Sequence, residues 1–263
     1  MIRRKLYLRF IGIIVCVTLL WIYVPSYVSL NHQQHRKHSE QKSNSSVDDL
    51  FDFNLLHDVI KSNDEQHLDE HKFNPLTDDN LVIIVQVHKR LKYLQNLIDS
   101  LSKVKFIEET LIIFSHDLMD EEINNSIRRI DFAKIKQIFF PFSTQIWHNT
   151  FPGQSFNDCP RDIGKKKYDF FFIDCTKLYS KYIFYIRALE INCDNADQPD
   201  SYGHYRESNV TQTKHHWWWK LWYVMEHLPQ TKKHHGDFLF IEEDHYVSPD
   251  LIHRWKLMKL SRK

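Results

Sequence analysis

The chain has 263 residues, 42% of them hydrophobic and 26% charged, a length that fits one globular domain with additional segments better than two full domains. Lys and Arg number 35 against 34 Asp and Glu, so the net charge of +1 gives no basic surface field and disfavours a nucleic-acid partner. With 14% aromatic residues, 7 Trp and only 5 Gly, the composition excludes a low-complexity chain and indicates a substantial packed core.

The N-terminus combines a basic cluster with an apolar run. Residues Phe10 to Val24 carry no charge, and the sequence stays weakly apolar to Leu30, which is long enough to cross a bilayer. The preceding basic residues are Arg3, Arg4, Lys5 and Arg9. By the positive-inside rule we expect a cytosolic tail (1–9), a transmembrane signal anchor (10–30) and a luminal remainder, as in a single-pass type II membrane protein. A cleaved signal peptide is the rival interpretation, but no small-x-small cleavage site follows the apolar run.

Residues 31–79 are polar and rich in His, Gln, Lys, Ser and Asp, which is typical of a stem or linker. A short helix over Leu50 to Ile60 is compatible with the apolar cluster there. Sequons that begin at Asn44, Asn124 and Asn209 fit a luminal location, although such triplets are common by chance.

An alternation of buried strands and amphipathic helices begins near residue 80. Continuous apolar runs predict strands, and apolar residues three or four apart predict helices. The expected strands are 81–85, 111–114, 135–140 and 238–241, and the expected helices are 91–101, 123–130 and 214–228. The order predicts an α/β domain whose parallel sheet has helices on both faces.

The acidic triplet 242–244 directly follows the last predicted strand. Ligands of open α/β sheets bind beyond the carboxyl ends of strands, and carboxylates there can hold Mg²⁺ or Mn²⁺ that bridges a diphosphate. A solvated acidic turn is the alternative for an isolated triplet. Neither GxGxxG nor GxxxxGK[ST] occurs, which argues against a dinucleotide-dependent dehydrogenase and a P-loop ATPase.

The segment 213–220, TKHHWWWK, is unusual in composition. Adjacent histidines point in different directions on a helix, so a zinc site is weakly indicated. For the three consecutive Trp, core packing is favoured over a sugar-stacking wall.

Seven motifs together resemble the N-acetylglucosaminyltransferase II family. They are IIVQVHKR (83–90), IFSHD (113–117), FFPFS (139–143), CPRD (159–162), PDSYGHYRE (199–207), QTKHHWWWK (212–220) and FIEEDHY (240–246). The resemblance covers about residues 80 to 255. It implies a GT-A type, Rossmann-like nucleotide-sugar-binding fold, and inverting transfer of GlcNAc from UDP-GlcNAc to the 2-position of the α-1,6-linked mannose of the N-glycan core, in the Golgi.

The resemblance also implies residue roles. The donor nucleotide-sugar would be bound by Gln86, Val87, His88, Lys89, Arg90, Asp117, Gln212, Thr213, Lys214, His215 and His216. Asp244 would be the ligand of a manganese ion, and Cys159 would pair with Cys193 in a disulfide. Oligomeric state is left open, with a homo-oligomer as one outcome.

Two departures from the family pattern are expected to matter. Residues 164–186 look inserted between the two cysteines, as an intron or misassigned exon would be. The chain ends at Lys263, soon after the metal motif, whereas the family continues with the acceptor-binding half, its catalytic Asp base and a metal-binding His. We therefore expect residues 80–263 to form an incomplete, donor-binding domain with no assigned base.

Other interpretations remain. One is a catalytically inactive membrane protein that keeps only the donor half and interacts with the full-length enzyme. Another is the related N-acetylglucosaminyltransferase I or the protein O-mannose enzyme, against which the HHWWWK and CPRD segments argue.

Overall fold

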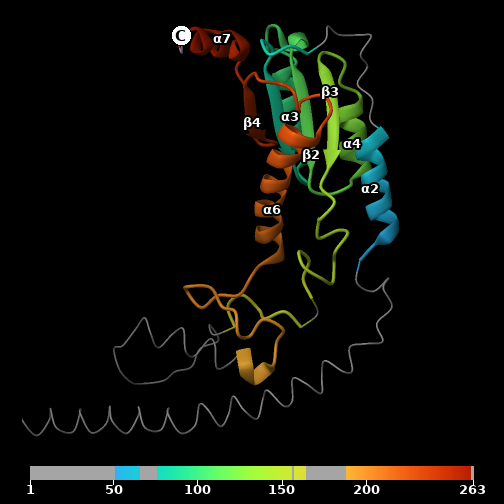
Figure 1. Ribbon diagram of the computed structural model, residues 1–263, viewed down its shortest axis with the longest axis vertical. Helices are drawn as coiled ribbons and strands as arrows, with labels where there is room; N and C mark the ends of the chain where they lie inside the picture. The colour runs from blue at the N-terminus through green and yellow to red at the C-terminus, as the bar shows by residue number, and fades with distance from the viewer. Residues whose placement is uncertain (1–50, 66–75, 156, 164–187, 262–263) are drawn as a thin grey trace, which may run out of the picture.

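The computed structural model describes residues 51–65, 76–155, 157–163 and 188–261. Its centre is a parallel sheet in the order β3-β2-β1-β4. The strands are β1 (Val82–Val87), β2 (Leu111–His116), β3 (Lys134–Phe139) and β4 (Phe238–Glu242). The α/β prediction, with its parallel sheet, is confirmed (Figure 1).

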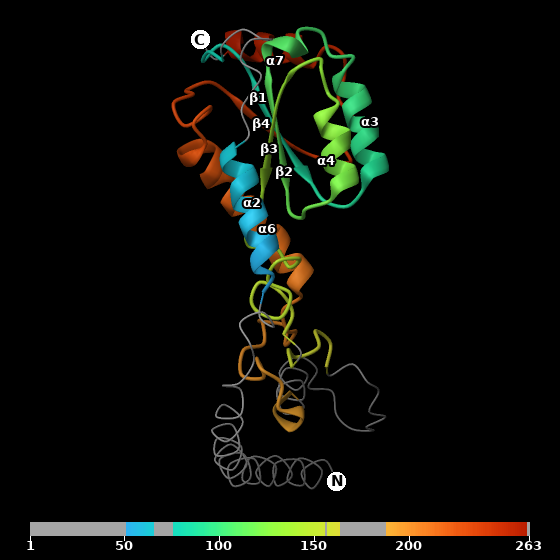
Figure 2. The ribbon, with the colours of Figure 1, turned by 90° about the vertical axis from the view of Figure 1, so that its right-hand side faces the viewer.

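Helices cover both faces of the sheet, as predicted. Figure 2 shows α3 (Leu91–Leu101) and α4 (Glu121–Arg128) on one side, and α2 (Phe53–Glu65) and α6 (Ser208–Trp222) on the other. On the α3 side, alternate strand residues such as Ile83 and Phe114 pack with Leu94 and Ile127. Because both faces are covered, β1 and β2 are buried throughout, which explains their continuous apolar runs.

The helix inside the expected stem is part of the folded body. This helix, α2 (Phe53–Glu65), packs its Val59 beside Phe139 of the edge strand β3. Asn63 extends the pairing of that edge: its Nδ2 donates to the Phe139 carbonyl at 2.8 Å, and its Oδ1 accepts from the Phe139 N–H at 2.7 Å. Part of the expected stem therefore packs on the sheet, where α2 protects an otherwise open strand edge.

The aromatic helix begins earlier than predicted. It comprises α6 (Ser208–Trp222) and a π-helical turn over Tyr223–His227, and the chain leaves it just before Pro229. Core packing is confirmed for Trp219, which is buried and stacks on Tyr223 at 4.8 Å between ring centroids. Trp218 is 76% exposed, so the core prediction is wrong for it.

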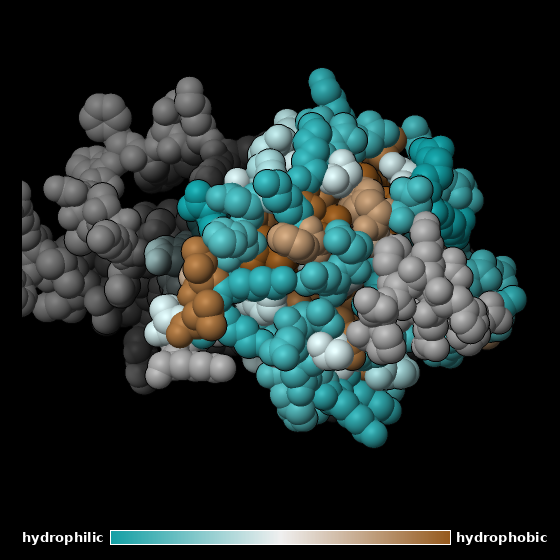
Figure 3. Space-filling view, turned by 90° about the horizontal axis from the view of Figure 1, so that it is seen from above, coloured by the Kyte–Doolittle hydropathy of each residue, from teal (hydrophilic) through white to brown (hydrophobic). Residues whose placement is uncertain are grey.

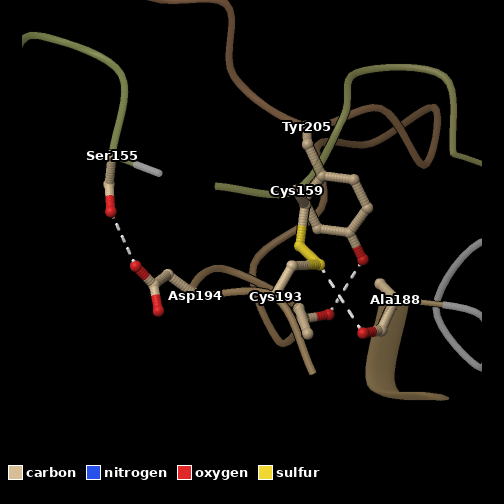
Figure 4. The surroundings of a disulfide bond; sticks show 7 residues. Ser155, Cys159, Ala188, Cys193, Asp194 and Tyr205 are labelled. Atoms are coloured by element: carbon tan, nitrogen blue, oxygen red, sulfur yellow. Dashed lines mark hydrogen bonds between the residues drawn. A yellow bond between two sulfur atoms is a disulfide. The ribbon is translucent and has the colours of Figure 1, made fainter. Parts of the chain in front are cut away.

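A disulfide-linked segment lies beyond the amino-terminal end of α6 (Figure 1). Cys159 and Cys193 are bonded, which confirms the predicted pair (Figure 4). Around them Ile163, Ala188 and Tyr205 form a small apolar cluster, with the Tyr205 hydroxyl donating to the Ala196 carbonyl at 2.9 Å. The bond joins chain before and after residues 164–186, which lie outside the described residues, so the structure does not bear on the expected insertion.

The last helix, α7 (Leu251–Ser261), closes the end of the sheet where β1 and β4 begin. Trp255 Nε1 donates to Asp237 Oδ2 at 2.8 Å, and Lys259 Nζ donates to Asp79 Oδ1 at 2.8 Å. Seen from above, the molecule shows hydrophobic side chains between hydrophilic ones (Figure 3).

The membrane anchor expected at 10–30 lies outside the described residues, as does most of the expected stem. Across the described ranges, none of the helices has the length and apolar character needed to span a bilayer.

Candidate functional site: the carboxyl edge of the sheet

The carboxyl ends of β1, β2 and β4 meet at one edge of the sheet. In the parallel register Gln86 of β1 pairs with Ser115 of β2 and with Glu242 of β4. Paired residues on neighbouring strands point to the same face, which here is the face covered by α6. The polar segments that follow these strands, 86–90, 115–117 and 242–244, are thereby brought together although they are distant in sequence.

The three acidic residues at the end of β4 differ in burial and in hydrogen bonding. The buried Glu243 carboxylate accepts hydrogen bonds from the His88 backbone N–H at 2.7 Å and from Arg90 Nε at 2.8 Å. Arg90 Nη1 also donates to Asp244 Oδ2 at 3.0 Å. Glu242 is half-buried, and Asp244 is the exposed member of the triplet. Glu243 thus links the end of β4 to the loop after β1, and Asp244 is exposed beside it.

Asp117 is the centre of a hydrogen-bonded chain across three elements. His88 Nδ1 lies 2.8 Å from both carboxylate oxygens of the buried Asp117. Gln212 Nε2 of α6 donates to Asp117 Oδ2 at 3.1 Å, and its Oε1 accepts from the Thr144 N–H at 2.5 Å. These hydrogen bonds place His88, Asp117 and Gln212 together, three residues that the resemblance assigns to the donor site. They also include Thr144, which was not predicted from the sequence.

One face of α6 carries hydrogen bonds from this helix to the ends of β1 and β2. Gln212 contacts Asp117, His216 Nε2 lies 2.7 Å from Ser115 Oγ, and Lys220 Nζ donates to Gln86 Oε1 at 2.6 Å. These helix residues are buried and recur every four positions, which places them on one face. Lys220 was not among the predicted site residues. Its signal was its position four residues after His216 and eight after Gln212, directly after three tryptophans.

The other predicted residues of α6 point elsewhere. Thr213 and Lys214 are exposed, and the His215 ring packs edge-on against Phe151 at 5.0 Å between centroids. Five consecutive helical residues span more than a full turn, so they cannot all face one ligand. The structure therefore separates Gln212 and His216 from the three residues between them.

The segment after β1 is also mixed. The Val87 side chain lies in the core on the α3 side, and its carbonyl accepts from the Asp117 N–H at 3.2 Å. Lys89 is exposed at the strand end. Only Gln86, His88 and Arg90 place their side chains in the hydrogen-bonded site.

Asp244 fits one contact to a hard divalent cation. Among the residues that the structure describes, no group of three or more His, Cys, Asp or Glu is arranged to hold a metal. Mg²⁺-like cations are commonly held by one or two carboxylates together with substrate phosphates and water. Of the two Asp244 carboxylate oxygens, Oδ2 faces Arg90 and Oδ1 lies 3.8 Å from His245 Nδ1. The donor set fits a metal that a diphosphate helps to hold.

The pKa of His88 is raised above 6.5. The hydrogen bond to Asp117 is the main cause, partial burial opposes it, and the charges of Asp117 and Glu243 add to it. A raised folded-state pKa stabilises the fold fully below pH 6.5, and this stabilisation is lost as the pH rises through the folded pKa. Thermal unfolding of the wild type and of His88→Gln from about pH 6 to 9 tests this. The difference in stability in favour of the wild type should decrease as the pH rises. A difference that is constant or grows with pH would contradict this.

Comparison with known proteins identifies relatives along this part of the chain. A family model of N-acetylglucosaminyltransferase II (MGAT2) matches residues 57–182 and 173–263. The alpha-1,6-mannosyl-glycoprotein 2-beta-N-acetylglucosaminyltransferases of Mus musculus and Homo sapiens are 48% and 46% identical to the chain over 178 residues, and that of Arabidopsis thaliana is 39% identical. Each match covers 68% of this chain, and the chain spans 36%, 35% and 36% of these relatives, respectively. The chain therefore belongs to the N-acetylglucosaminyltransferase II family.

Proposed function

We propose that this chain forms the donor-binding part of a glycosyltransferase of N-glycan processing. The enzyme would transfer GlcNAc from UDP-GlcNAc in β-1,2 linkage to the α-1,6-linked mannose of the N-glycan core on glycoproteins. The observation that carries the proposal is the hydrogen-bonded assembly of His88, Asp117 and Gln212 at the carboxyl edge of a parallel sheet. The names of the relatives support the sugar, the linkage and the acceptor.

The charges at this edge suit a diphosphate. The His88 ring and the Arg90 guanidinium are each about half exposed, with side-chain exposures of 50% and 45%, and both are held by buried carboxylates. Oriented cationic donors bind phosphate oxygens more strongly than flexible ones do. We assign His88 and Arg90 to the donor diphosphate, with the exposed Lys89 as a further cation nearby.

Asp244 would hold the manganese ion implied by the resemblance. When bound, such an ion acts as a Lewis acid that neutralises charge on the departing nucleoside diphosphate. The residues of this chain would hold the Asp244 carboxylate in place. The Arg90 guanidinium bridges Asp244 and the buried Glu243, and so fixes the position of the loop after β4.

An inverting transfer needs a carboxylate to take the proton of the attacking hydroxyl. In the described site, hydrogen bonds from His88, Gln212 and Arg90 engage the carboxylates of Asp117 and Glu243. We therefore do not assign the role of base to either of these two carboxylates.

We also propose a Golgi membrane location with a luminal catalytic part. Two sequons within the described residues provide a test, since Asn209 is exposed and Asn124 is buried in α4. When the protein is expressed in secretory cells, N-glycosidase treatment should change its electrophoretic mobility. Asn209→Gln should reduce this change by one glycan, and Asn124→Gln should not. If neither the glycosidase nor Asn209→Gln changed the electrophoretic mobility, this result would argue against luminal exposure of α6.

Calorimetric titration of the purified chain tests donor binding. In the presence of MnCl₂ we expect saturable binding of UDP-GlcNAc and no comparable binding of GDP-mannose or ADP-ribose. Equal binding of all three nucleotides, or none of UDP-GlcNAc, would contradict the proposed function.

A further inference from the structure

Lys220 is a buried cation directly beneath the proposed donor site. Its side chain is fully buried, its Nζ donates to Gln86 Oε1 at 2.6 Å, and the same nitrogen lies 3.2 Å from the centroid of the Trp217 ring. Among the described residues, no ion pair to a carboxylate accompanies these contacts.

The environment of Lys220 is unfavourable for its charge. Burial lowers the pKa of Lys220 to about 7, although the nearby charges of Glu242 and Asp117 act to raise it. An apolar side chain of similar length would occupy the same space without the cost of removing an ammonium from water. Packing alone therefore does not account for a lysine at this position.

The contact fixes the orientation of the Gln86 amide. Because Lys220 Nζ donates to Gln86 Oε1, the carbonyl oxygen of the amide faces the lysine and the amide NH₂ turns away from it. In the parallel register, Gln86 occupies the last row of β1 on the α6 face, beside Ser115 and Glu242. The Gln86 NH₂ is therefore available as a hydrogen-bond donor at the carboxyl edge of the sheet, where the nucleotide is proposed to bind.

We propose that Lys220 is a positioning residue that holds the Gln86 amide with its NH₂ directed at an oxygen acceptor of the donor nucleotide. This inference rests on the proposed function. Lys220 acts through Gln86 and does not touch the nucleotide. The acceptor is an oxygen of the uridine or of the diphosphate, since both groups present oxygens.

A double-mutant cycle in donor affinity tests the coupling. The full chain is titrated with UDP-GlcNAc and MnCl₂ as wild type, Lys220→Met, Gln86→Ala and the double variant. Each single change should raise Kd about fivefold to tenfold, as expected for one lost hydrogen bond, and the double variant should be no worse than either. Lys232→Met, an exposed lysine in the turn that follows this helical segment, is the matched control and should leave Kd unchanged.

A purely structural role would give a different pattern. Coupling between Lys220 and Gln86 in thermal unfolding with none in Kd, or fully additive losses of affinity, would overturn the inference. In the absence of nucleotide, Lys220→Met should also shift the side-chain NH₂ resonances of Gln86, and unchanged resonances would count against it. If the wild type itself does not bind UDP-GlcNAc, the proposed function fails and this inference fails with it, which is a distinguishable result.

Gln86→Glu covers the case in which Lys220→Met does not fold. The glutamate keeps an acceptor for Lys220 but has no NH₂ to offer. We expect its donor affinity to fall at least as far as that of Gln86→Ala. Affinity equal to that of the wild type would overturn the inference.

Discussion

Asp117→Asn is expected to weaken both the fold and the donor site, although it changes only one atom of the side chain. Asp117 accepts from His88 and from Gln212, and the amide of Gln212 cannot turn round because its Oε1 accepts from the Thr144 N–H. An asparagine would place an NH₂ opposite one of these donors and leave a buried polar group unsatisfied. We expect a loss of about 1–3 kcal/mol in the free energy of unfolding. Because His88 loses its anchor, we also expect a roughly tenfold rise in Kd for UDP-GlcNAc.

Asp120→Asn is the matched control for this change. Asp120 caps α4, where its side chain accepts from the Ile123 N–H at 3.0 Å. Asparagine caps helices about as well as aspartate does, so this variant should unfold and bind like the wild type. If urea unfolding and donor titration gave the same result for the two variants, the claim that Asp117 must accept hydrogen bonds from both His88 and Gln212 would be refuted.

Acidification is expected to destabilise the protein strongly through His116. This side chain ends β2, is buried against the Phe139 ring, and has its pKa lowered by burial from 6.5 to about 3. Between pH 6.5 and about pH 3, His116 is protonated in the unfolded chain and neutral in the folded chain. The free energy of unfolding therefore decreases as the pH falls below 6.5. From pH 6.5 to pH 5 the loss from His116 is about 2 kcal/mol. The pKa of the buried His216 is lowered in the same way and adds to the loss, whereas the raised pKa of His88 acts in the opposite direction.

Urea unfolding at about pH 7 and pH 5 measures this effect. His116→Phe keeps an aromatic ring against Phe139 and removes the titrating group. The variant should lose less free energy of unfolding than the wild type over this interval. The same loss in both proteins would show that the buried ring of His116 does not cause the acid sensitivity.

The framework of the fold could be predicted because its signals are local. The run from Leu81 to Val85 is apolar because both faces of β1 are covered, and the residues of α3 repeat at helical spacing. Asp117 was assigned to the site by the resemblance, and it lies directly after β2. The role of α2 could not be predicted, because its packing against Phe139 depends on a strand edge that exists only in the folded sheet.

Side-chain direction accounts for most of what was missed at the site. The sequence 242–244 gives three acids in a row, and only the fold shows that Glu243 is buried against His88 and Arg90 while Asp244 is exposed. Within α6, the rotation of the helix decides that His216 faces Ser115 and His215 faces Phe151. A sequence motif specifies which residues are present but not which way each one faces on the helix. Helical periodicity predicts part of this information.

Paramagnetic broadening of backbone amide resonances by Mn²⁺ in the presence of UDP-GlcNAc tests most directly whether the carboxyl edge of the sheet is the donor site. The account predicts broadening centred on Asp244 that extends to His88, Asp117 and Gln212, and its loss in Asp244→Asn. Resonances of the disulfide-linked segment around Cys159 should stay sharp. Broadening centred on that segment, or broadening unchanged in Asp244→Asn, would contradict the account.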